Sequence, residues 1–109
     1  MRTITLRDPR GGAWTVEVPE NRRERMRGLL GREKLPPGHG LLLMRTRSIH
    51  TIGMRFPIMV ALLDGDLRVV ETKRVVPGRV LLPRRRARHI LECAAEADLR
   101  PGDRLVADP

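Results

Sequence analysis

The feature that most constrains the fold of this chain is the unbroken apolar run IMVALL at residues 58–63. A strand with one face in solvent alternates polar and apolar side chains, so a run that is apolar on both faces predicts an interior strand. Asp64 and Gly65 follow at once and give the strongest hairpin signal in the sequence. We therefore predict that residues 67–76, LRVVETKRVV, return beside this strand as its antiparallel partner.

A second hairpin and a single helix are predicted before this central ribbon. Residues 3–8 and 13–18 alternate polar and apolar side chains around the turn sequence PRGG, which is typical of a β-hairpin. Residues 20–30 carry apolar side chains at the spacing of one helical face, and Gly31 is placed to end the helix in left-handed geometry. Gly28 inside the helix costs about 1 kcal/mol relative to alanine. We therefore expect another segment to pack closely against its backbone.

Further short strands complete the predicted fold. The nine prolines and ten glycines are spread along the chain, as expected for short elements joined by tight turns. Many short strands with one helix predict a mainly β fold, a compact antiparallel sandwich or barrel, in one domain over residues 1–109. The remaining strands are expected at residues 40–44, 47–52, 80–82, 89–95 and 104–107.

Composition narrows the class of protein. Apolar residues make up 40% of the chain, and the core they build is aliphatic, since Trp14 and Phe56 are the only aromatic residues. No apolar run is long enough for a transmembrane helix, and the first residues lack the apolar core of a signal peptide. Cys93 is the only cysteine, so we expect no internal disulfide, a buried unreactive thiol and a cytoplasmic location.

The chain is strongly basic, with a formal net charge of +9. Only Lys34 and Lys73 among the 22 basic residues are lysines, a bias that a G+C-rich genome can produce. The charge nevertheless attracts nucleic acid, acidic proteins and anionic surfaces. No aromatic side chain accompanies the basic tract at residues 84–88 to stack on bases, so a solvated loop is the competing interpretation. The candidate nucleic-acid contacts in this tract are Arg84, Arg85, Arg86 and Arg88.

A polar cluster directly before the central strand is the candidate ligand site. His50 carries an imidazole, which can act as a general base or contact a ligand. Arg55 precedes a Phe-Pro pair, whose extended geometry holds the guanidinium in a position suited to a carboxylate or a phosphate. The alternatives are structural: the cluster forms a rigid corner, and Arg55 makes an internal ion pair with Glu92.

The sequence gives little support for a metal site or for a phosphate-binding loop. The three histidines share no metal-ligand spacing, and Cys93 has no companion. The glycine pairs are turn residues and form no phosphate-binding loop. We expect neither a metal nor a cofactor.

Three separated motifs resemble those of the domain of unknown function 192 family. They are ERMRGLLGREKL at residues 24–35, SIHTIGMRFPI at residues 48–58, and HILECAA followed by LRPGDRL. The resemblance covers nearly the whole chain and implies a small, mostly β domain with a short helix near its N-terminus. It implies no established activity. Many members have Asp where this chain has Met59, so no acid–base or metal role of that Asp carries over.

These features favour a non-catalytic binding module for a small anionic ligand or a protein partner. A nucleic-acid or acidic-protein binder that uses the arginines of residues 84–88 is the first alternative. A hydrolase-like enzyme that uses His50 is the least favoured hypothesis, because the sequence shows no triad around this residue. The candidate ligand-binding residues are His50, Thr51, Arg55, Arg25 and Glu92.

Overall fold

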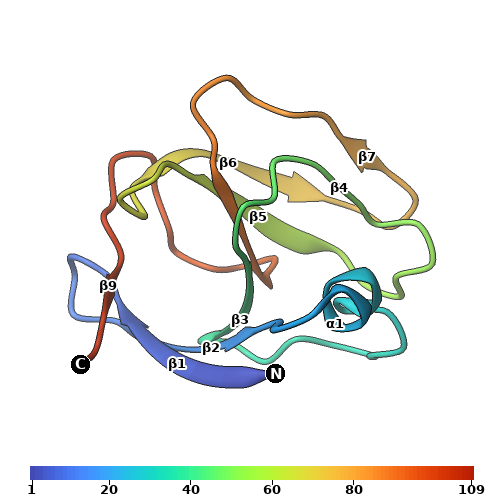
Figure 1. Cartoon of the computed structure of the whole chain (residues 1–109), viewed down its shortest axis with the longest axis horizontal. Helices are drawn as coiled ribbons and strands as arrows, with labels where there is room; N and C mark the ends of the chain where they lie inside the picture. The colour runs from blue at the N-terminus through green and yellow to red at the C-terminus, as the bar shows by residue number, and fades with distance from the viewer.

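A curled seven-stranded sheet forms most of the computed structural model, which describes residues 1–109 (Figure 1). Its strands lie in the order β6-β5-β8-β3-β2-β1-β9, and a separate two-stranded sheet pairs β4 with β7. The elements are β1 (Arg2–Arg7), β2 (Ala13–Val18), α1 (Arg22–Arg27), β3 (His39–Leu43), β4 (Ile49–His50), β5 (Ile58–Leu63), β6 (Val69–Val75), β7 (Val80–Leu81), β8 (His89–Ala94) and β9 (Val106–Ala107).

The predicted central strand is confirmed as β5, which pairs in antiparallel register with β6 on one side and β8 on the other. The hairpin turn between β5 and β6 is confirmed as well. Asp64 Oδ1 accepts the backbone N–H groups of Asp66 and Arg68 at 2.8 and 3.0 Å. Leu67 completes the turn in the left-handed region, with a φ of 62°. This turn therefore fixes the register of the ribbon that carries the most apolar strand.

The prediction of a β-rich fold with one short helix is confirmed, and most strand pairs are antiparallel. The pair β2–β3 is the exception, because these strands run parallel. The chain between them passes through α1 and returns to the same end of the sheet, and a parallel pair requires a crossover of this kind. The crossover places α1 over one face of the sheet (Figure 1).

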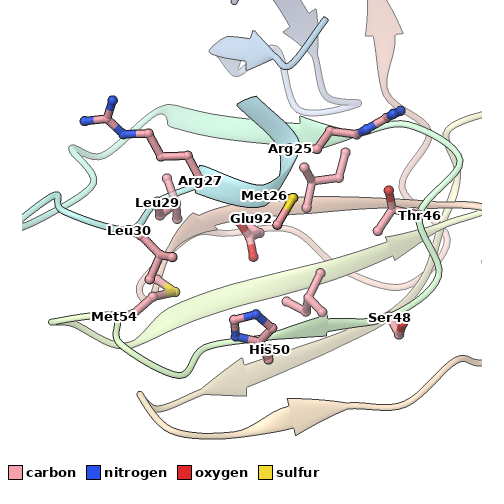
Figure 2. A pocket seen from close by; sticks show the side chains of 13 residues that line it. Arg25, Met26, Arg27, Leu29, Leu30, Thr46, Ser48, His50, Met54 and Glu92 are labelled. Carbon is pink, nitrogen blue, oxygen red and sulfur yellow. The ribbon is translucent and has the colours of Figure 1, made fainter. Parts of the chain in front are cut away.

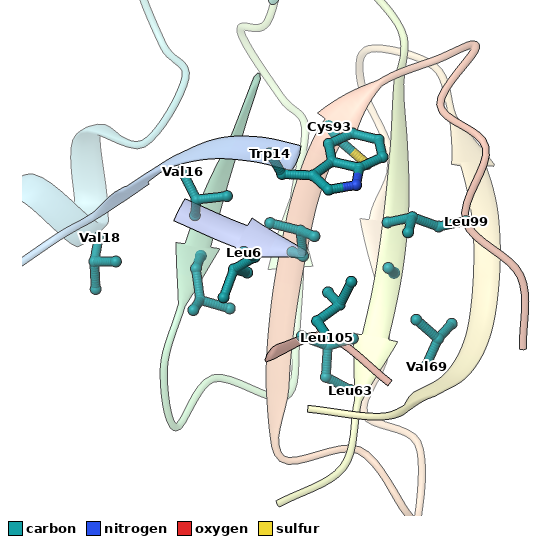
Figure 3. Packing of buried hydrophobic residues seen from close by; sticks show 12 residues of the cluster. Leu6, Trp14, Val16, Val18, Leu63, Val69, Cys93, Leu99 and Leu105 are labelled. Carbon is teal, nitrogen blue, oxygen red and sulfur yellow. The ribbon is translucent and has the colours of Figure 1, made fainter. Parts of the chain in front are cut away.

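Both faces of the sheet are buried. The strands β3, β5 and β8 send alternate side chains to opposite faces, so each face has a core of its own. Figure 3 shows the first core, in which Trp14 and Cys93 lie over aliphatic side chains. The second core packs Leu29, beside α1, and Leu81, on β7, against strands β3, β5 and β8. An interior strand covered on both faces has no room for a polar side chain without an energetic cost.

The helix is shorter than predicted and ends earlier. Asn21 caps its N-terminus by accepting the N–H of Glu24 at 2.9 Å, and Glu24 accepts the N–H of Glu20 at 2.8 Å. The helix ends at Gly28, whose φ of 49° is left-handed. The prediction that Gly31 ends the helix is therefore wrong. Gly28 stands at the C-cap rather than inside the helix, so its conformation, and not close packing, is what favours glycine.

Three of the remaining predicted strands exist but are shorter. They are β4, β7 and β9, each with two residues. The strands β3 and β8 form close to the predicted residues. The one helix is too short and too polar to span a bilayer.

Candidate functional site

A pocket of about 170 Å³ lies between α1 and the small sheet formed by β4 and β7 (Figure 2). We call it the α1 pocket. Its walls are mostly aliphatic, and its polar lining comes from separate parts of the chain: the end of α1, the β3–β4 connection, β4 and β8. The apolar lining side chains are Met26, Leu29, Leu30, Leu43, Ile49 and Met54.

Glu92 forms the floor of the α1 pocket, and it is the one charged side chain on the buried part of β8. Its neighbours across the sheet are Leu41 on β3 and Val60 on β5, so its own strand register surrounds it with aliphatic groups. Glu92 is only 4% exposed. Its carboxyl makes no hydrogen bond or ion pair with any other residue. No side-chain oxygen of the chain is both sealed from solvent and without a partner, so the Glu92 oxygens are reached from the pocket. Figure 2 shows the carboxyl directed into the space between α1 and β4.

Burial controls the protonation of Glu92. Removal from water disfavours the charged form of a carboxyl, and no cation lies close enough to compensate. Burial therefore raises the pKa of Glu92 from 4.5 to about 7. Near neutral pH the floor of the α1 pocket holds a carboxyl that is neutral in part of the molecules and can donate a hydrogen bond.

His50 lines the α1 pocket from the side opposite α1 (Figure 2). The short strand β4 positions it by pairing His50 with Val80 on β7. The imidazole is exposed and makes no hydrogen bond within the protein. It is therefore free to contact a ligand that enters the pocket.

Arg25 stands at the rim of the α1 pocket, as does Arg27 from the same helix. Both side chains are exposed, and neither forms an ion pair. Figure 2 shows their guanidinium groups on opposite sides of α1, both directed away from Glu92. Arg27 and Met26 are site residues that the sequence reasoning missed. Met26 belongs to the predicted apolar face of the helix, but this side chain is 72% exposed.

Thr51 does not line the α1 pocket, although it follows His50 directly. It is 1% exposed. Its hydroxyl donates to the carbonyl of Val76 at 2.7 Å and accepts the N–H of Arg79 at 2.9 Å. These bonds, together with two backbone bonds to the same turn, hold β4 against residues 76–79. Thr51 thus supports His50 from behind.

Arg55 also lies outside the α1 pocket, and the ion pair with Glu92, which was the structural alternative, is not formed. Its side chain is 63% exposed, and its guanidinium lies 4.0 Å from the carboxylate of Glu33. Arg55 precedes β5 in a surface loop, whereas Glu92 sits in the interior of the sheet. Of the five candidate ligand-binding residues, the structure brings together Arg25, His50 and Glu92.

The basic tract at residues 84–88 lies away from the α1 pocket. Arg84 pairs with Glu71 at 3.3 Å, and Arg88 donates to the carbonyls of Arg85 and Ala87. The buried Ala87 anchors the loop. Arg85 and Arg86 are exposed and form no ion pair.

Cys93 and Met59 occupy the face of the sheet opposite the α1 pocket. Cys93 is buried, and burial, followed by the nearby charge of Glu92, raises the pKa of its thiol to about 12. The prediction of a buried thiol is confirmed. Met59 packs with the same core. No group of three or more His, Cys, Asp or Glu side chains is placed to hold a metal ion.

These features define a small protein with a curled β-sheet and a pocket beneath its helix. The floor of that pocket carries a carboxyl group. The model of the domain of unknown function 192 family, described as "Uncharacterized ACR", matches residues 4–107. The chain belongs to this family. No curated protein matches the sequence.

Two solved structures have the same fold. The first is a proposed transcription regulator from Sinorhizobium meliloti 1021, 22% identical, with a TM-score of 0.81 over 96% of this chain and 92% of that one. The second is a protein of unknown function from Novosphingobium aromaticivorans, 20% identical, with a TM-score of 0.78 over 95% of this chain and 83% of that one. At these identities the likeness extends to the fold alone.

The variant Glu92→Gln is expected to be more stable than the natural chain at alkaline pH. The folded pKa of about 7 lies above the ordinary 4.5, so the natural chain loses stability as the pH rises from 4.5 to 7. The loss amounts to about 3 kcal/mol. Urea unfolding should show a gain of that order at pH 8 and little difference at pH 4. Glu96→Gln, at an exposed glutamate, is the matched control, and an equal response of both variants would contradict the assignment.

The variant Thr51→Val is expected to destabilise the fold by about 1–3 kcal/mol, because it leaves the N–H of Arg79 without its acceptor. Valine has nearly the shape of threonine, so packing is preserved. Thr3→Val, at an exposed position of β1 whose hydroxyl makes no hydrogen bond, is the control. Equal midpoints of urea unfolding for the two variants would show that the Thr51 hydroxyl does not hold β4 in place.

Proposed function

We propose that this protein is a non-catalytic binding module whose α1 pocket takes a small anionic ligand. The observation that supports the proposal is Glu92, a buried carboxyl that faces the pocket without any partner in the protein. Buried polar groups are almost always hydrogen-bonded. Because its oxygens open onto the pocket, the carboxyl of Glu92 can find this partner only there, in water or in a ligand that displaces the water.

The size of the pocket limits the ligand. A cavity of about 150 Å³ accepts a benzene molecule, and the α1 pocket measures about 170 Å³ with an open mouth. The aliphatic walls provided by Leu29, Leu30 and Met54 suit an apolar body. A ligand of about six to nine non-hydrogen atoms, apolar along its length and polar at its ends, fits these walls.

The charges around the mouth favour an anion. Arg25 and Arg27 lie at the rim, and neither has an acidic partner that would have to be displaced. Both side chains are long and exposed, so a guanidinium can turn toward a carboxylate or phosphate and form paired hydrogen bonds. An anion within reach of Glu92 would favour its neutral form, which then donates its O–H to the ligand.

Binding without chemistry is the better supported function. The ring of His50 has no hydrogen bond that would orient it as a general base. The thiol of Cys93 lies on the opposite face, and its pKa of about 12 keeps it protonated. The polar groups that do meet in the pocket can hold a ligand, but they do not form a nucleophile with its base.

A size-matched panel of benzoate, benzylamine and benzyl alcohol tests the charge of the ligand. Benzoate is expected to shift the backbone amide resonances around the α1 pocket in a saturable manner, and to bind more tightly than the other two. Two-dimensional NMR titration at pH 6.5 measures each dissociation constant. Tighter binding of benzylamine would show that Glu92 acts as an anion for a cationic ligand, and the proposal would be wrong.

The double variant Arg25→Gln/Arg27→Gln is expected to weaken benzoate binding about five- to tenfold, the range for two partly exposed ion pairs. The matched control is Arg22→Gln/Arg23→Gln, which removes the same charge from the same helix outside the pocket. If both double variants bind benzoate with similar affinity in the same titration, Arg25 and Arg27 contribute only through the general charge of the protein.

A further inference from the structure

A second concave site lies where three connections of the chain meet. Arg45 and Arg47 come from the β3–β4 connection, Gly65 from the β5–β6 turn, and Arg88 and His89 from the start of β8. These five residues line a hollow of about 420 Å³, which we call the basic hollow. No carboxylate and no apolar side chain is among them.

Internal hydrogen bonds fix the shape of the basic hollow. The backbone N–H of Arg45 donates to Nδ1 of His89 at 2.8 Å, and Arg45 itself is held in the left-handed region with a φ of 53°. Since Nδ1 accepts this bond, the proton of the neutral imidazole resides on Nε2, which remains a donor. Arg47 donates to the carbonyl of Arg84 at 3.1 Å and so ties two of the connections together.

The positive charge of the basic hollow is not neutralised within the protein. Arg45, Arg47 and Arg88 form no ion pair, although other arginines of this chain do. Burial, followed by the charges of Arg45 and Arg88, lowers the pKa of His89, and Asp64 opposes this effect only in part. Asp64 is itself engaged by the backbone N–H groups of its own turn. The fold therefore holds like charges together at a cost that an anion would relieve.

We infer that the basic hollow is a binding site for phosphate groups, and specifically for the backbone of a nucleic acid. Guanidinium groups bind phosphate through paired N–H donors, and Nε2 of His89 adds a further donor at the wall. Arg85 and Arg86, exposed and unpaired in the adjoining loop, extend the positive surface beyond the hollow. Arginines in both the hollow and the adjoining loop can contact more than one phosphate, which favours a chain of phosphates over a single free ion.

The side chains of the site predict whether its binding to a nucleic acid depends on base sequence. Neither the hollow nor the loop at residues 84–88 contains a Phe, Tyr or Trp side chain, so bases have no large aromatic surface on which to stack. Contacts to phosphate carry no sequence information by themselves. The interaction is therefore expected to be independent of sequence and strongly dependent on salt. It does not involve the α1 pocket, which none of these residues lines.

Fluorescence anisotropy with a 20-base-pair duplex of mixed sequence tests the inference. Each phosphate contact contributes about 0.9 to the slope of log affinity against log salt. Arg45→Gln should lower the magnitude of that slope by about 0.9, and Arg45→Gln/Arg88→Gln by about 1.8. The side chain of Arg45 makes no bond within the protein, so the single variant keeps the fold even if the double variant does not. Arg22→Gln/Arg23→Gln removes an equal charge elsewhere, and slopes that fall equally in this control would overturn the inference.

Titration with inorganic phosphate identifies the source of the phosphate group. Phosphate is expected to raise the pKa of His89, followed by the NMR signals of its ring, and to do so less in Arg45→Gln. If both phosphate and duplex act at His89, the backbone of nucleic acid is supported. If phosphate acts and the duplex does not, the site is for a small phosphate ligand. If neither moves the His89 signals, the basic hollow is not an anion site.

Benzoate binding in the α1 pocket should remain unchanged in Arg45→Gln. The proposal for each site can therefore be contradicted without affecting the other.

Discussion

The burial of both faces of the central strands is the constraint on which the rest of the structure depends. Strands β5 and β8 lie side by side, and each sends apolar side chains into two separate cores. On one face Leu29, in the segment after α1, packs against the apolar surface that these strands present, and on the other face Leu6 and Trp14 of the β1–β2 hairpin do the same. With so few aromatic residues, this surface is made by Leu, Ile and Val packed at close spacing.

Glu92 is an exception to the burial of apolar side chains at the centre of the sheet. Its position makes this exception informative. A carboxyl between Leu41 and Val60 weakens the fold at neutral and alkaline pH, where an aliphatic residue would not. Natural proteins retain such costs mainly where a function needs them. The carboxyl opens onto the α1 pocket and not onto the packed part of the core, which agrees with a role in binding.

Two physically different groups can be distinguished among the arginines of this chain. Some serve the fold: Arg10 binds Asp103 through two hydrogen bonds of 3.0 and 2.7 Å, and Arg84 pairs with Glu71. Others have no acidic partner and gather around a concave surface, at the rim of the α1 pocket or in the basic hollow. Net charge alone cannot separate these groups, because the difference lies in what each guanidinium meets across the fold.

The sequence by itself determined the central ribbon at residues 58–76, the first hairpin, the burial of Cys93 and the β-rich class, because alternation and turn chemistry act between near neighbours. It also named Arg25, His50 and Glu92, but as members of a set that included Thr51 and Arg55. Only the tertiary structure separated them. Register placed Glu92 on the face beneath α1, while the turn at residues 76–79 took up the hydroxyl of Thr51 and the loop before β5 left Arg55 in solvent. Which face a side chain occupies, and which distant segment covers that face, depends on long-range pairing that local sequence does not encode.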